Sequence, residues 1–206
     1  PLVSSSAASD VYKRQDPFKV EGEVTLKNAA MRVKPADLQI EAINGVVSFD
    51  DKQVRAGDLQ ARVLDRPVVI DITPKLTKAG RWTRIATEIE LSAEELRRLY
   101  PDFWLPPGSG KTRGRVRVDI AHQDSRVPVQ LRVLSSLRGL KLDMPKPLGK
   151  AAKRRRDMDL SVNFLAGGGS ELRLLYDKEV HGLVRLPADE TKDCLLYTSD
   201  AADDET

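Results

Sequence analysis

Hydrophobic and polar residues alternate along most of the chain with a period of two residues. The alternation is clear over 20–26, 38–42, 68–72, 115–120, 129–133, 159–164 and 171–174. Successive side chains of a β-strand point to opposite faces, so this pattern predicts strands with one apolar and one polar face. Such strands are typical of antiparallel sheets, and the predicted fold class is therefore mainly β.

Short polar or glycine-rich segments predict the turns between these strands. They are Asn44-Gly45, 50–52, 65–67 and 167–169. One segment departs from the strand pattern, because Ser92 and Glu95 form a capping box and apolar residues follow at helical spacing. We predict a short helix over 93–99, ended by Pro101, and a Pro-rich loop around 101–110.

The apolar positions of the later strands form the candidate functional surface. They are Val116, Val118, Ile120, Val129, Leu131, Val133, Leu160, Val162, Phe164, Leu172 and Leu174. Only one short helix is available to cover this face. Either two halves of the sheet close on each other or the face lines something apolar, and periodicity does not choose between them.

The composition excludes several classes of protein. Of the 206 residues, 40% are hydrophobic and 32% are charged, which is a soluble globular balance. No run of apolar residues is long enough to predict a membrane-spanning helix. One cysteine and two histidines argue against a disulfide scaffold and a zinc site, so we expect no metal or other cofactor. An aromatic content of 5% argues against a stacking platform for nucleic acid.

Both ends of the chain resemble translated sequencing adapter. Residues 5–15 and 194–203 are encodable by opposite strands of one transposase-library oligonucleotide. We therefore expect residues 1–15 and 194–206 to be adapter-derived, and the body over 16–193 to be a fragment of a longer protein. The only cysteine, Cys194, lies in the second of these segments.

No motif predicts catalysis. The segment 108–112 resembles the end of a P-loop, but Leu105 stands where that motif needs glycine and a strand pattern follows where it needs a helix. We predict a polar turn here and no nucleotide binding. His122 and His181 lie far apart in the sequence, and no nucleophile can be argued beside either, so we expect no enzyme activity.

A basic cluster lies between the strands predicted at 129–133 and 159–164. It comprises Lys146, Lys150, Lys153, Arg154, Arg155 and Arg156. A solvated loop is the interpretation we favour, and contact of residues 150–156 with anionic lipid head groups or another acidic envelope component is the second. Nucleic acid is not expected, because the body has no groove-reading helix and few aromatic residues.

Three segments resemble the YhdP family, a group of AsmA-like proteins of the Gram-negative envelope. The most specific is 135–150, which reads SSLRGLKLDMPKPLGK, and the others are Leu38–Asp50 and Leu59–Val68. The charged residues at 153–156 depart from the expected family pattern.

The resemblance implies a very long periplasmic protein, anchored in the inner membrane by a helix outside this fragment. Its fold would be an elongated antiparallel sheet curved into an open apolar groove, with segments over 16–91 and 111–193 joined by the helix and loop of 92–110. Related proteins are implicated in moving phospholipid to the outer membrane, so the resemblance implies acyl chains as ligands. The alternative is a structural envelope spacer whose sheet packs on itself.

Overall fold

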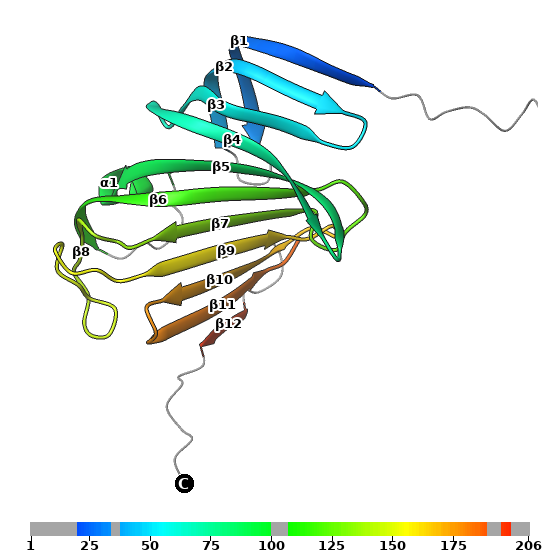
Figure 1. The fold of residues 1–206 in the computed structure, drawn as a ribbon. Coiled ribbons are helices and arrows are strands. Elements are labelled where there is room, and N and C mark those ends of the chain that lie inside the picture. Colours follow the sequence, from blue (N-terminus) through cyan, green and yellow to red (C-terminus); the bar gives the residue numbers. More distant parts are fainter. Residues whose placement is uncertain (1–19, 34–37, 100–106, 189–194, 199–206) are drawn as a thin grey trace, which may run out of the picture.

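The computed structural model describes residues 20–33, 38–99, 107–188 and 195–198. In these ranges the chain forms one open antiparallel sheet, with β8 paired to the start of β6 beside the main path (Figure 1). Strands and helix follow in the order β1 (Glu21–Val33), β2 (Leu38–Asp50), β3 (Val54–Val63), β4 (Arg66–Thr77), β5 (Gly80–Ser92), α1 (Ala93–Leu99), β6 (Gly108–Ala121), β7 (Val129–Ser135), β8 (Leu140–Leu142), β9 (Met158–Phe164), β10 (Ser170–Tyr176), β11 (Val180–Leu186) and β12 (Leu195–Thr198). The predicted mainly β fold is confirmed.

The first three strands are bent by bulges that lie close to one another in the sheet. Asn28, Ala42 and Asp58 have φ angles of 51°, 49° and 54°, and the pairing register shifts beside each of them. The Asn44 side chain joins two of the bulges, because its Oδ1 accepts from the Asn28 N–H at 2.9 Å and its Nδ2 donates to the Ala42 carbonyl at 2.7 Å. Bulges bend a strand, and Figure 1 shows β1 and β2 turning within their length.

The main buried core lies on the apolar face of β2 to β5. Its members are Ile40, Ile43, Ala56, Leu59, Ala61, Val63, Val68, Ile70 and Ile89. Leu59 at its centre is 2% exposed, and Leu26 of β1 and Val116 of β6 pack against the cluster. The bent N-terminal strands therefore cover their own apolar face with side chains from β1 to β6.

Two turn predictions were wrong. Asn44 and Gly45 lie inside β2, where Gly45 has a φ of 139° next to the bulge and the chain does not reverse. The segment 108–112 begins β6 and pairs with β8. A Cβ on Gly108 or Gly110 would lie 2.2 Å from a carbonyl oxygen of the β8 region, so these glycines allow two backbones to approach closely.

The other predicted turns and the helix are confirmed. Segments 50–52 and 167–169 lie between neighbouring strands, the turn predicted at 65–67 lies at Leu64-Asp65 with β4 beginning at Arg66, and α1 spans Ala93–Leu99. The Ser92 Oγ accepts from the Glu95 N–H at 3.1 Å, and the Glu95 carboxylate accepts from the Ser92 N–H at 2.7 Å. The Arg66 guanidinium beside Glu95 is the main reason why the pKa of this carboxyl falls to about 2. Pro101 lies outside the described residues.

Replacing Leu59 by alanine should destabilise the fold by about 2–5 kcal/mol, because a fully packed aliphatic side chain would leave a cavity. Leu76 is 81% exposed, so Leu76→Ala is the matched control and should change the free energy of unfolding by less than about 0.5 kcal/mol. Urea denaturation of both variants measures the difference. Equal effects would contradict the assignment of the core.

Candidate functional site

Apolar side chains form three rows that run across the strands on one face of the sheet. The central row consists of directly opposed residues on seven strands, which are Ile72, Ile85, Val118, Leu131, Val162, Leu172 and Val184. On one side of it Val116, Val133, Leu160 and Leu174 form a second row, and on the other side Ile120, Val129 and Phe164 form a third. We refer to these side chains together as the apolar rows.

All eleven residues that the sequence singled out lie in the apolar rows. The structure also adds Ile72, Ile85 and Val184 to the central row. Ile72 belongs to a strand that the alternation predicts, but nothing in the sequence pairs that strand with β5 and β6. The contribution of these three residues is visible only once the strand order is known.

The apolar rows are less covered than the core of the N-terminal strands. Among the eleven predicted residues only Val118, at 9% exposed, counts as buried, and the others are half-buried. The pairings from β5 to β11 carry no register shift, so these strands do not curl onto themselves as β1 to β3 do. The described part of the chain therefore leaves the apolar rows of β6 to β10 partly open.

A small second core closes the face at one end of these strands. Tyr176 on β10 packs with Ala93 of α1 and with Leu137 and Leu140 of the loop region after β7. The Tyr176 hydroxyl donates to the Leu148 carbonyl at 2.8 Å. We call the segment 137–150 together with Ala93 the end cap, because it covers the ends of the strands and leaves the apolar rows beside it.

Lys150 lies inside the end cap and holds its loop together. Its side chain donates to the carbonyl oxygen of Leu137 at 2.7 Å and also to that of Leu140, and the residue is only 5% exposed. Burial lowers the pKa of this ammonium group. The neighbouring Gly149 allows close packing, because a Cβ there would lie 1.8 Å from the Met144 carbonyl oxygen.

Arg156 also points into the protein. Its guanidinium pairs with Asp177 at 2.6 Å and with Glu179 at 2.9 Å, and it lies 5.9 Å from the centroid of the Tyr176 ring. Arg155 is exposed and pairs with Asp157 at 2.9 Å. The structure therefore divides the basic cluster. Of the residues expected to contact anionic head groups, Lys150 and Arg156 are buried, and Lys153, Arg154 and Arg155 are exposed. That contact remains a prediction.

These features place the chain in a class of proteins that are built on an open antiparallel sheet with one partly uncovered apolar face. The family model described as YhdP protein matches residues 10–194, and the chain belongs to the YhdP family. This is a family of cell-envelope proteins, and membership fits a lipid-transport AsmA-like protein. No curated protein and no solved structure matches the chain. Within the described ranges no helix has the length and hydrophobicity of a membrane span.

Replacing Lys150 by methionine should destabilise the end cap, because the carbonyl groups of Leu137 and Leu140 would lose a charged donor while staying buried. The expected loss is about 1–3 kcal/mol of unfolding free energy, measured by chemical denaturation. Lys153 is exposed, so Lys153→Met is the control and should have little effect. If the two variants were equally stable, Lys150 would not have this structural role.

Proposed function

We propose that the chain is a non-enzymatic segment of a periplasmic, inner-membrane-anchored AsmA-like protein that conducts phospholipid between the inner and outer membranes. The observation that carries this proposal is the continuity of the partly exposed apolar rows across consecutive strands. Membership of the YhdP family supports the same function. The acyl chains would lie along the apolar rows, with head groups toward solvent.

The physical reason is the cost of exposing acyl chains to water, about 0.8 kcal/mol for each CH₂ group. Over β6, β7, β9 and β10 the central row consists of Val118, Leu131, Val162 and Leu172, and at a strand spacing of about 4.8 Å it extends over roughly 14 Å. A bilayer core of about 30 Å holds two leaflets, so one acyl chain needs about half of that length. The row therefore matches the length of about one acyl chain, which can lie along it against aliphatic side chains.

A structural spacer is the second candidate function, and the buried core of β2 to β5 favours it. In that half of the sheet the protein covers its own apolar face, as an ordinary packed domain does. The proposed lipid contact is therefore assigned to β6 through β10 and not to the bent N-terminal strands. The two candidate functions differ in what lies against Leu131.

Photo-crosslinking distinguishes them. A photoreactive residue in place of Leu131 in the full-length protein should give phospholipid adducts in cells, which mass spectrometry detects. Gln130 is the control, because it lies next to Leu131 on the opposite face and its amide donates to Asn163 at 2.8 Å. Adducts only within the protein at position 131 would favour the spacer.

Charges placed in the apolar rows should impair lipid transport. Leu131→Asp or Val162→Asp in the full-length protein should reduce the supply of phospholipid to the outer membrane, because the carboxylate interrupts the apolar path. Gln130→Asp and Ser161→Asp place the same charge on the same strands but on the polar face, and should transport normally. Normal folding and normal transport in the first pair would contradict the lipid path.

A further inference from the structure

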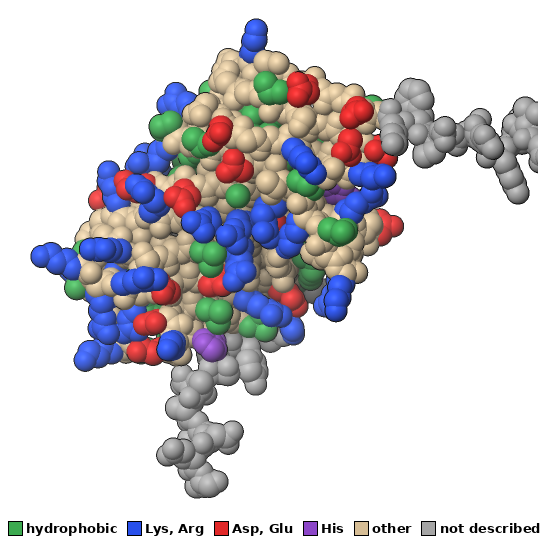
Figure 2. Space-filling view, in the orientation of Figure 1, with side chains coloured by type: hydrophobic (Ala, Val, Ile, Leu, Met, Phe, Trp, Pro, Cys, Tyr) green, Lys and Arg blue, Asp and Glu red, His purple; other side chains and the backbone are tan. Residues whose placement is uncertain are grey.

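The face opposite the apolar rows carries a row of arginines across the middle strands. Arg117 of β6 lies directly opposite Arg132 of β7, Arg132 lies opposite Ser161 of β9, and Ser161 lies opposite Arg173 of β10. Figure 2 shows Lys and Arg side chains gathered over the middle of this face. We call Arg117, Arg132 and Arg173 the arginine row.

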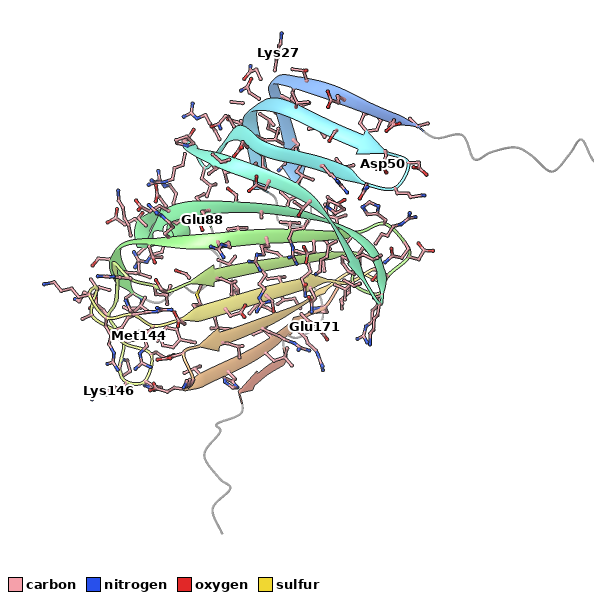
Figure 3. All side chains as sticks on the ribbon, viewed as in Figure 1. Lys27, Asp50, Glu88, Met144, Lys146 and Glu171 are labelled. Carbon is pink, nitrogen blue, oxygen red and sulfur yellow. The ribbon has the colours of Figure 1, made fainter. Side chains whose placement is uncertain are left out.

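Four carboxylates on the same face are bound to basic groups, and one of these groups is Arg132 of the arginine row. Asp119, at 5% exposed, accepts from Arg84 and from Lys75, each at 2.8 Å. Glu88 of β5 pairs with Arg115 at 3.0 Å, and Glu171 of β10 pairs with Arg185 at 3.3 Å; Figure 3 labels both glutamates. Asp159 binds Arg132 with an Oδ1 to Nε distance of 2.8 Å. The face therefore carries more positive than negative charge.

The side chains of Arg117 and Arg173 have no hydrogen-bond or ion-pair partner within the described ranges. Arg117 is half-buried and faces the guanidinium-bearing Arg132 across the strand pair. Directly opposed like charges destabilise a sheet, and while Asp159 offsets the charge of Arg132, no carboxylate of the described residues does so for Arg117. The hydrogen bond to Asp119 raises the pKa of Arg84, and the charge of Arg132 is a smaller effect in the opposite direction.

Leucine side chains lie beside the arginines on this polar face. Leu183 of β11 is directly opposite Arg173, while Leu134 of β7 and Leu175 of β10 lie in the adjacent row. Leu175 is 43% exposed. Arginine next to exposed aliphatic groups is a composition suited to a protein interface, where guanidinium groups bind carboxylates in bidentate pairs.

We propose that this face docks an acidic segment of a partner protein, with its carboxylates on Arg117 and Arg173 and an apolar side chain near Leu175. The charge complementarity selects an acidic occupant, and the exposed Leu175 selects a protein. A lipid bound to the apolar rows lies on the other side of the sheet, so its head group is separated from the arginine row by the backbone. The proposal does not depend on the lipid-conducting function.

The test uses the 206-residue chain and a fluorescently labelled oligo-glutamate peptide with a central leucine. Fluorescence anisotropy at low salt should show binding, and the double variant Arg117→Gln, Arg173→Gln should weaken it by about tenfold or more. The matched control is Arg126→Gln, Arg138→Gln, which removes the same charge from exposed residues outside the strands. This control should bind like the unchanged chain.

Three results would overturn the proposal. The first is that the chain does not bind the peptide, and the second is that both double variants weaken peptide binding equally. The third is that Arg117→Gln, Arg173→Gln weakens binding to phosphatidylglycerol vesicles but not binding to the peptide. The last result would assign the face to a membrane surface. Thermal unfolding checks the fold, and Arg117→Gln, Arg173→Gln should melt no lower than the unchanged chain, because the substitutions remove a repulsion.

Discussion

Each member of the apolar rows on β6, β7, β9 and β10 lies directly opposite another apolar side chain, and this in-register antiparallel pairing is the constraint on which the other features depend. A slip of one residue between any two strands would turn every aliphatic group to the polar face. The ladder from β5 to β11 contains no register shift, so the alternation along each strand becomes a continuous apolar surface across the strands. Without this in-register pairing, the apolar side chains of neighbouring strands would not lie on the same face.

The two halves of the sheet differ because only one of them carries bulges. In β1 to β3 the bulges at Asn28, Ala42 and Asp58 bend the strands, and the aliphatic groups on the inside of the bend bury one another. The regular strands after β5 cannot curl in this way, so their apolar rows stay partly exposed except where the end cap covers the strand ends. Local backbone geometry thus decides where the chain forms a core and where it leaves an apolar surface.

The period-two pattern predicted β1, β2, β4, β6, β7, β9 and β10 but not β3, β5, β8, β11 or β12, and the capping box at Ser92 and Glu95 was sufficient to predict the helix. Both are local signals that act within a few residues. The failures concern glycine and asparagine, which serve turns, bulges and close backbone contacts equally well. Asn44-Gly45 forms part of a bulge, and Gly108 and Gly110 allow the approach of β8, a contact made by residues about thirty positions away.

The interior positions of Lys150 and Arg156 were missed for a related reason. A run of basic residues favours a solvated loop by composition, and the partners that hold these two side chains come from distant parts of the chain. The arginine row likewise cannot be recognised from the sequence, because the strand order alone brings Arg117, Arg132 and Arg173 close together. The sequence did show that each of them points away from the apolar residues of its own strand.

An uncovered apolar face limits the hydrophobic stabilisation available to the later strands, so the polar face gains importance there. Its ion pairs join neighbouring strands, as Glu88 with Arg115 and Arg132 with Asp159 do. Exposed pairs of this kind contribute only about 0.2–1 kcal/mol each, so their main effect is to favour one register over its alternatives. Arg117 and Arg173 take no part in these described pairs, and their charge therefore does nothing to fix the register. These two guanidinium groups are therefore available to an anion from outside the chain.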